Sequence, residues 1–101
     1  MTDNEKLARW QGWSRTNGGN WINPFTKMTC FEYPDYLNDD AAAMSLLDTL
    51  VEKGYTYYLA GDAREVDLRI FKGGDGICLR IKPTRREAVV SALLRLIEKE
   101  N

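Results

Sequence analysis

The side chains that most often perform acid–base and nucleophilic chemistry are sparse in this sequence of 101 residues, which contains no histidine. Without histidine the chain cannot form a Ser-His-Asp triad, a Cys-His pair or a His-ligated metal site. Ser14, Ser45 and Ser91 therefore have no imidazole to activate them, and no lysine-activated serine motif accompanies them. We predict that the protein is not an enzyme and that it has no catalytic residues, no metal site and no cofactor.

Two short motifs could suggest a ligand site, but their contexts favour structural roles. Residues 73–76 (Gly-Gly-Asp-Gly) lack the Gly-Lys-Ser/Thr ending of a nucleotide-binding loop and separate two predicted strands, so we expect a hairpin loop. Asp35, Asp39 and Asp40 lack the regular spacing of a calcium-binding loop. We expect these aspartates to cap the helix that follows them.

Hydrophobic periodicity predicts the elements that must position any site. Apolar residues repeat at helical spacing over about residues 3–11, 41–53 and 85–99, and capping boxes begin the first helix (Thr2 with Glu5) and the last (Thr84 with Glu87). A hairpin with an Asn-Pro turn is expected over residues 21–31, and alternating patterns predict strands over 55–60, 66–72 and 77–82. The apolar face of the middle helix should consist of Ala43, Leu47, Leu50 and Val51.

The short loops between the last three strands predict an antiparallel meander. The predicted fold is α+β and forms a single domain over residues 1–101, with the order α-β-β-α-β-β-β-α. In this fold the antiparallel sheet is sandwiched between helices, in helix/sheet/helix layers. A four-residue loop at 73–76 sets Leu68 opposite Ile81 and Ile70 opposite Leu79, which makes one face of the sheet aliphatic.

The same register places Arg69 opposite Arg80 on the other face of the sheet, near Tyr58. Two like charges directly opposite each other destabilise a sheet unless an acceptor lies nearby. We therefore expect this face to be covered, either by a partner or by the segment that contains Leu7, Trp10 and Trp13; of the two, cover by the chain's own segment is favoured.

Aromatic residues in and beside loops provide the strongest indication of binding. We expect Trp10, Trp13 and Trp21 to form a small satellite core between helix and sheet, which leaves other aromatics available. Aromatic and arginine side chains are the types that most often anchor protein interfaces. The predicted partner-binding residues are Phe25, Tyr33, Tyr36, Tyr58, Arg69 and Arg80.

An alternative function is a small-ligand or nucleic-acid-binding domain. A small ligand could use Tyr58, Arg69 and Arg80. The αβββα order of the second half is also that of a double-stranded-RNA-binding domain, and Lys82, Arg85 and Arg86 surround the start of its last helix. A net charge of −1, from 14 Lys plus Arg and 15 Asp plus Glu, argues against nucleic acid as the partner.

The expected compartment is the cytoplasm, without membrane attachment. The first six residues are acidic where a signal peptide would be basic, and no apolar run approaches the roughly 18 residues that span a bilayer. Cys30 and Cys78 form no Cys-x-x-Cys motif and are expected to be free thiols. An edge strand of the meander could pair across a two-fold axis, so a homodimer remains open.

Five short motifs are spread along nearly the whole chain. They are Leu-Ala-x-Trp-x-Gly-Trp at 7–13, Trp-x-x-Pro at 21–24, Pro-Asp-Tyr-Leu-Asn-Asp at 34–39, Lys-Gly-Tyr at 53–55 and Arg-Arg-Glu-Ala-Val-Val at 85–90. In these motifs the chain resembles the phage ABA sandwich domain family. The sequence departs from the family pattern in the polar stretch before Trp21. The resemblance implies a sheet between helical layers and a protein of phages or prophages that acts in the bacterial cytoplasm, with no catalytic residue set to transfer.

From these observations we predict a non-enzymatic phage or prophage accessory protein that binds a host or phage protein. The specific role that we expect from the resemblance is inhibition of a bacterial antiviral defence system.

Overall fold

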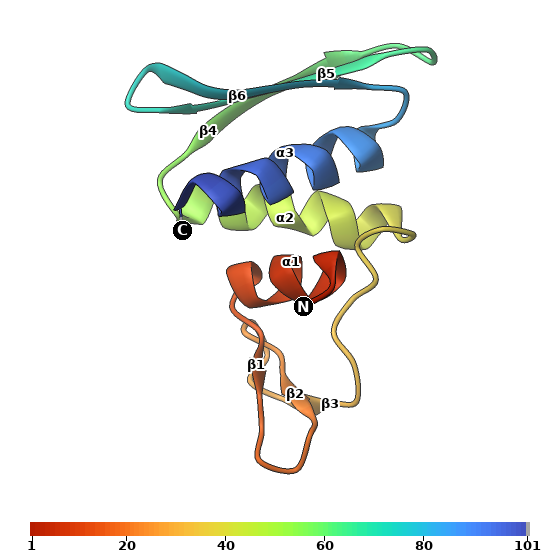
Figure 1. Ribbon diagram of the computed structural model, residues 1–101, viewed down its shortest axis with the longest axis vertical. Helices are drawn as coiled ribbons and strands as arrows, with labels where there is room; N and C mark the ends of the chain where they lie inside the picture. The colour runs from red at the N-terminus through yellow and green to blue at the C-terminus, as the bar shows by residue number, and fades with distance from the viewer. Residues whose placement is uncertain (101) are drawn as a thin grey trace.

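The computed structural model describes residues 1–100, which form three helices and two three-stranded antiparallel sheets (Figure 1). The elements in chain order are α1 (Asp3–Gln11), β1 (Ser14–Arg15), β2 (Trp21–Ile22), β3 (Thr29–Cys30), α2 (Asp40–Glu52), β4 (Thr56–Gly61), β5 (Val66–Lys72), β6 (Asp75–Lys82) and α3 (Arg85–Glu100). The predicted α+β class and antiparallel meander are confirmed. Strand β1 was not expected, because two residues with exposed polar side chains give no periodic signal.

The helices begin where the sequence predicts because the capping residues act locally. Thr2 Oγ1 accepts from the backbone N–H of Glu5 at 3.2 Å, and Thr84 Oγ1 accepts from that of Glu87 at 3.1 Å. Asp39 caps α2 by accepting from the N–H groups of its first turn at 2.9 and 3.2 Å. The expected capping roles are therefore confirmed for these three residues. The expectation is wrong for Asp35, whose side chain accepts from Asn4 and Asn38, and for Asp40, which forms an ion pair with Arg86.

The sheet of β4, β5 and β6 has helices on one face only. Helix α3 contacts β5 and β6, and α2 contacts β4, so these two helices form a layer against the sheet. Helix α1 contacts α3 and lies on the side of that layer away from the sheet, and the small β1–β2–β3 sheet lies beyond it (Figure 1). The expectation that Leu7, Trp10 and Trp13 cover the second face of the sheet is therefore wrong.

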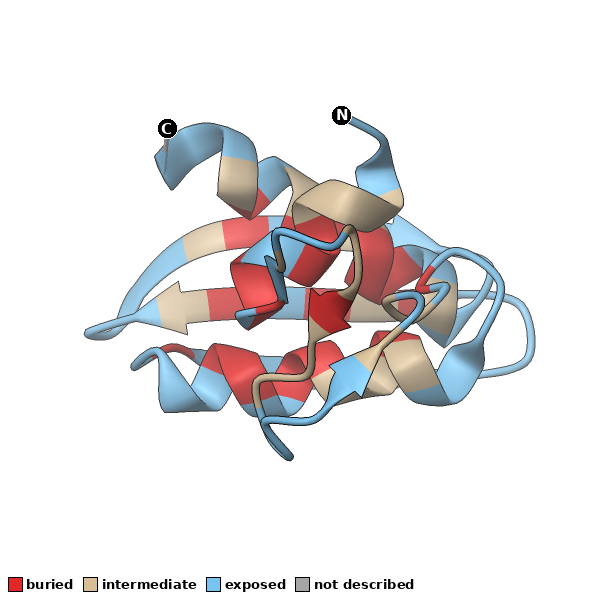
Figure 2. Cartoon of the chain, turned by 90° about the horizontal axis from the view of Figure 1, so that it is seen from below, coloured by how far each residue is buried: buried red, intermediate tan, exposed pale blue. Residues whose placement is uncertain are grey.

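The core is a single cluster of buried side chains that runs from the main sheet through α2 and α3 to α1 (Figure 2). Trp10, Trp13 and Trp21 are buried as expected, but they lie on α1 and the small sheet, and α1 makes no extensive contact with the main sheet. On α2 the buried face includes Leu46 in place of the predicted Val51, which is exposed. Helix α3 packs along α2, and Gln11 at the end of α1 donates hydrogen bonds to Ser45 and Thr49, so these contacts set the buried face of α2.

The register between β5 and β6 differs from the prediction. The connecting turn contains only Gly73 and Gly74, both with positive φ, and Lys72 pairs with Asp75. An irregularity after Ile70 then sets that residue opposite Cys78 and Arg69 opposite Leu79. A shift by one residue exchanges the two faces of a strand. Cys78, Arg80 and Lys82 consequently lie on the helix side, and Leu79 and Ile81 lie on the open side.

The small sheet is held against the end of α1. Pro24, in the loop between β2 and β3, approaches Gly12 so closely that a Cβ on the glycine would lie 3.0 Å from the proline Cβ. Gly12 has φ +113 and ends α1 in the left-handed conformation. Of the helices formed by residues 1–100, none combines the length and apolar character needed to cross a bilayer.

Candidate partner-binding surfaces

The polar groups that sequence analysis tested for chemistry have structural roles in the fold. Ser45 Oγ donates to the carbonyl of Ala42 at 2.6 Å and accepts from Gln11 Nε2 at 3.0 Å. Asp35 accepts from the amides of Asn4 and Asn38 at 2.8 and 2.9 Å, and these hydrogen bonds lower the pKa of its carboxyl group. Over residues 1–100, no three metal-binding side chains gather into a potential site.

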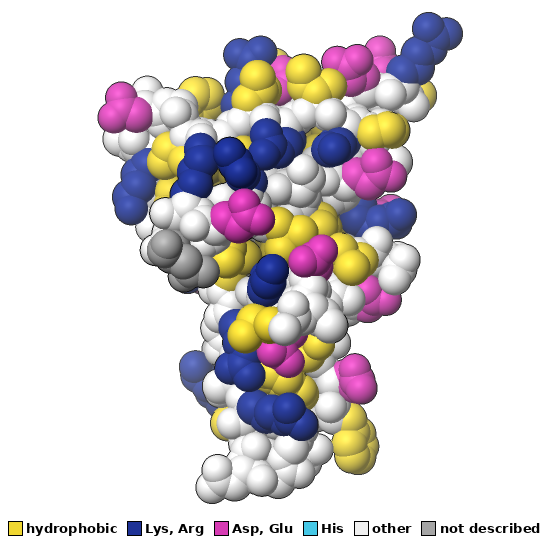
Figure 3. All heavy atoms as spheres, in the orientation of Figure 1, with side chains coloured by type: hydrophobic (Ala, Val, Ile, Leu, Met, Phe, Trp, Pro, Cys, Tyr) yellow, Lys and Arg dark blue, Asp and Glu magenta, His cyan; other side chains and the backbone are white. Residues whose placement is uncertain are grey.

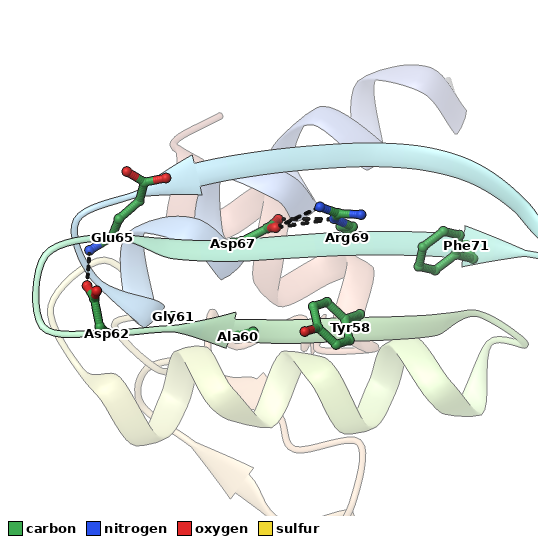
Figure 4. Close-up of a pocket in the computed structure, with 8 residues that line it drawn as sticks. All are labelled: Tyr58, Ala60, Gly61, Asp62, Glu65, Asp67, Arg69 and Phe71. Atoms are coloured by element: carbon green, nitrogen blue, oxygen red, sulfur yellow. Dashed lines mark hydrogen bonds and ion pairs between the residues drawn. The ribbon is translucent and has the colours of Figure 1, made fainter.

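The second face of the main sheet is exposed, and we call it the open sheet face. Tyr58 and Arg69 lie on it as predicted, and their side chains stand with Asp67 and Phe71 on one side of the sheet (Figure 4). They line a shallow hollow of about 770 Å³. The residues that form the centre of the open sheet face are Tyr58, Ala60, Asp67, Arg69, Leu79 and Ile81.

Apolar side chains on the open sheet face are unusually accessible. Tyr58 is 56% exposed, Leu79 50% and Ile81 51%. Leu79 and Ile81 were predicted to be in the core, and the register shift in β6 explains why they are not. Hydrophobic and charged side chains alternate along the end of the molecule that the main sheet forms, at the top of Figure 3. Such an accessible apolar face is typical of an interaction surface.

The charge arrangement on this face also differs from the prediction. Arg69 lies opposite Leu79 and forms an ion pair with Asp67 of its own strand, with 3.1 Å between Arg69 Nη2 and Asp67 Oδ2. The predicted Arg69–Arg80 like-charge pair is wrong, because Arg80 lies opposite Leu68 on the helix side. The centre of the face is consequently neutral.

Arg80 helps to protect the outer edge of β6. Its Nη1 donates to the carbonyl of Leu79 at 2.9 Å, and Lys99 Nζ donates to the carbonyl of Ile77 at 2.8 Å. Cationic side chains that occupy edge carbonyls oppose the addition of another strand there. This arrangement disfavours a homodimer formed by pairing of β6 edges and separates Arg80 from the other predicted partner-binding residues.

The three basic residues of the nucleic-acid alternative are only partly available. Arg86 Nη1 forms an ion pair with Asp40 Oδ1 at 2.7 Å. Lys82 and Arg85 are exposed, and neither has an ion-pair partner within residues 1–100. Lys82 shares a hollow beside α3 with Glu87 and other charged side chains, which dilutes the positive field.

Two of the predicted interface tyrosines are not available. Tyr36 is fully buried, and its hydroxyl donates to Gln11 Oε1 at 2.5 Å. Burial raises its pKa above the usual value of tyrosine. Tyr33 is half-buried and packs edge-on against Trp21, with 4.8 Å between the ring centroids. Tyr36 is therefore a core residue, and Tyr33 belongs to the packing of the small sheet.

Phe25 is exposed as predicted, and it lines a second hollow that we call the hairpin groove. This groove, of about 610 Å³, lies between the β2–β3 loop and the outer stripe of α2. Phe25 and Val51 are each 55% exposed, and between them they present an apolar surface to solvent. The residues that line the groove are Phe25, Ser45, Asp48, Val51 and Glu52.

The β2–β3 loop holds Phe25 in this exposed position. Asn23 Oδ1 accepts from the backbone N–H of Phe25 at 2.8 Å and from that of Thr26 at 3.3 Å, and its own backbone pairs with Lys27 and Met28. Lys27 adopts φ +64, a conformation that is uncommon for a residue other than glycine. The loop is consequently well defined by hydrogen bonds, although its aromatic side chain has little cover.

Other exposed apolar residues accompany the hairpin groove. Met28 is 66% exposed and Phe31 87% exposed, and the two residues flank β3. The small sheet that contains β3 lies at the end of the molecule away from the main sheet (Figure 1). Sequence analysis did not select Met28, Phe31 or Val51 as binding residues: it assigned Val51 to the apolar face of the middle helix and placed the other two in the hairpin without a role. An apolar residue that remains exposed is recognisable only when the surrounding packing is known.

The rim of the hairpin groove is acidic. Asp48 and Glu52 lie one turn apart on α2, and no ion pair involves either carboxylate within residues 1–100. Lys53, the nearest basic residue along the chain, lies 4.8 Å over the Trp10 ring. The groove therefore combines an apolar floor with a negative rim.

The chain matches no protein-family model, and comparison with curated proteins and with solved structures finds no similar protein.

Proposed function

We propose that the protein is a non-enzymatic binding protein and that its hairpin groove docks a basic, partly apolar segment of a partner protein. The observation that carries this proposal is the position of Phe25. A hydrogen bond from its backbone to Asn23 keeps the Phe25 side chain exposed, and it lies beside two carboxylates that have no ion-pair partner in residues 1–100. A folded domain gains nothing from this arrangement alone, because an exposed phenyl ring and two nearby like charges contribute little to its stability.

A partner would stabilise the groove through both of its features. Burial of the phenyl ring of Phe25 and the methyl groups of Val51 by an apolar side chain contributes on the order of 1.5–3 kcal/mol for each residue that becomes fully buried. Lys or Arg side chains beside that anchor would neutralise Asp48 and Glu52 and would speed association at low salt. The proposed partner segment therefore pairs an aliphatic or aromatic anchor with positive charge.

The motifs that resemble the phage ABA sandwich domain family suggest the biological setting. We propose that the protein is a phage or prophage accessory protein and that its partner is a host or phage protein in the bacterial cytoplasm. Inhibition of an antiviral defence system is the role that fits a small binding protein of this kind, because such inhibition requires occupancy of a surface and no chemistry.

The charge and apolar requirements can be tested with a defined probe. We expect a fluorescent amphipathic peptide of Leu and Lys to bind the wild-type protein and to bind Phe25→Ala at least about tenfold more weakly. The double variant Asp48→Lys with Glu52→Lys should also weaken binding at least about tenfold, and added salt should reduce the difference. The matched control, Asp3→Lys with Glu98→Lys, makes the same change in net charge away from the groove.

Two outcomes would contradict the proposal. One is equal binding of the peptide by the groove variants and by the control. The other is a partner captured from bacterial lysate equally well by the wild-type protein and by Phe25→Ala. Salt-dependent binding of short RNA or DNA duplexes that is lost in Arg85→Ala with Arg86→Ala would instead favour the nucleic-acid alternative.

A further inference from the structure

The open sheet face contains two neighbouring rows of side chains that run across all three strands. The first row consists of Tyr58, Arg69 and Leu79, which are directly paired through the registers of β4, β5 and β6. The second row consists of Ala60, Asp67 and Ile81, paired in the same way. Each row has one residue from each strand, and the two rows are two residues apart along β5.

From this pattern we infer that the open sheet face binds a second copy of the same chain. The two sheets would stack face to face about a two-fold axis that lies between them and crosses β5 at right angles near Leu68. Rotation about this axis makes the strands of the second copy run opposite to those of the first. It also sets the first row of each copy against the second row of the other. The inference does not depend on the hairpin groove.

The exchanged rows are complementary at each of the three strands. Arg69 of one copy faces Asp67 of the other, so the two ion pairs within the chains become a cluster of four alternating charges. On β4 the large Tyr58 faces the small Ala60, and on β6 Leu79 faces Ile81. Stacked sheets pack about 10 Å apart with their strands within about 30° of each other, which keeps these neighbours in contact.

The charge pattern favours a second copy over a different protein. Asp67 and Arg69 lie side by side at the centre of the face, so the centre has no net charge and offers little attraction to a strongly acidic or basic surface. Asp62 and Glu65 lie at one end of the same hollow, outside the two rows. The face's own two-fold image matches each charge of the centre with its opposite. If the axis instead lay parallel to β5, Asp67 would face Asp67 and Arg69 would face Arg69, so the charges also select one of the two orientations.

The size of the face sets the expected strength of association. Three strands of about seven residues cover a projected area of about 14 by 23 Å, and their side chains make the solvent-accessible area larger than this. That projected area, about 320 Å², is well below the roughly 800 Å² that each partner buries in a standard-size interface, so this contact belongs with the weak, transient ones. We therefore expect a weak dimer that dissociates at micromolar concentration. Its two small sheets would lie at opposite ends, because in each chain the small sheet lies beyond α1, on the side away from the main sheet (Figure 1).

Sedimentation velocity over a range of protein concentrations tests this inference directly. We expect the wild-type protein to shift from monomer to dimer, and we expect Asp67→Arg to raise the dimer dissociation constant at least about tenfold because four positive charges then meet. Arg69→Asp should act in the same way with four negative charges. The double variant Asp67→Arg with Arg69→Asp restores the alternation and should recover most of the dimer.

A second variant and a control separate loss of the dimer from loss of the fold. Leu79→Lys, on an exposed position, should also give a monomer whose circular dichroism matches that of the wild-type protein. Arg95→Glu, on the exposed side of α3, changes charge away from the face and should leave the dimer intact. A wild-type protein that remains monomeric up to millimolar concentration would overturn the inference, as would a dimer unaffected by Asp67→Arg. Peptide binding at the hairpin groove is measured separately and would stand in either case.

Discussion

The hydroxyl of Tyr36 donates to Gln11 Oε1 at 2.5 Å, across 25 positions of the chain. The same Oε1 accepts from Trp13 Nε1 at 3.3 Å, and Gln11 Nε2 donates to the hydroxyls of Ser45 and Thr49 at 3.0 and 3.3 Å. One buried amide therefore joins the end of α1, the loop before α2 and α2 itself. These hydrogen bonds satisfy polar groups that would otherwise be buried without partners.

Tyr36→Phe should lower the free energy of unfolding by about 1–2 kcal/mol, because it removes a hydrogen bond from a buried amide oxygen without changing the packing. Urea denaturation followed by tryptophan fluorescence measures this loss. The matched control is Tyr33→Phe, since no hydrogen bond of the Tyr33 hydroxyl is found within residues 1–100 and the ring remains against Trp21. The control should change stability by no more than about 0.5 kcal/mol. Equal losses in both variants would contradict the role given to Tyr36.

The sequence predicts the helix starts correctly because the determinants are local. Thr2, Asp39 and Thr84 each lie within three residues of the N–H groups that they cap. The strands of the main sheet are also predicted to within a few residues, because alternation of apolar and polar side chains is a local pattern.

Register and burial could not be predicted in the same way because they depend on distant contacts. On β6, residues 77–82 alternate aliphatic with basic or thiol side chains, and either set could face the helices. The two-residue turn and the irregularity after Ile70 decide this choice. Tyr36 and Phe25 both lie in loops. The loop that contains Tyr36 packs on Gln11, which makes Tyr36 a core residue, whereas Phe25 has no such contact and is exposed.

Gly61→Ala should destabilise the fold by about 2 kcal/mol or more. A Cβ at this position would lie 2.6 Å from the Cα of Val66 and would also collide with the carbonyl oxygen of Glu65, so backbone would have to move. Thermal unfolding by circular dichroism measures the effect. Gly54→Ala provides the comparison, because its φ of +94 is strained for alanine but no atom lies within 4 Å of the new methyl group. If Gly54→Ala cost more than Gly61→Ala, the close approach between β4 and β5 would not be the cause.

Tyr55 should make stability fall as the pH rises from 10 to 12. A hydrogen bond of 2.7 Å to Glu100 raises the pKa of Tyr55 from 10.0 to about 12. The raised pKa means that the folded state keeps the proton after the unfolded chain has lost it, so the contribution is complete below pH 10 and is lost up to about pH 12. Denaturation at a series of pH values should show a smaller fall for Glu100→Gln than for the wild-type protein.

The control for this prediction must keep the contact that the Tyr55 ring makes with Lys72. Lys72 Nζ lies 4.9 Å over that ring. Tyr55→Phe keeps Lys72 over an aromatic ring and removes only the phenol. A pH profile of Tyr55→Phe that matches the wild-type profile would contradict the role of Tyr55.

The two cysteines should react at very different rates with a thiol reagent. Cys30 and Cys78 are both free thiols, as predicted, but Cys30 is half-buried at the small sheet, whereas Cys78 is buried between β6 and α3 and its Sγ lies 3.9 Å from the carbonyl oxygen of Ala92. Modification requires the thiolate to meet the reagent, so Cys30 should react in the native state and Cys78 only after the sheet separates from α3. In Cys30→Ser, the remaining thiol should therefore react at a rate that increases with urea as global unfolding does. A fast reaction of Cys78 at low urea would show that β6 and α3 separate locally, which would conflict with its place in the core.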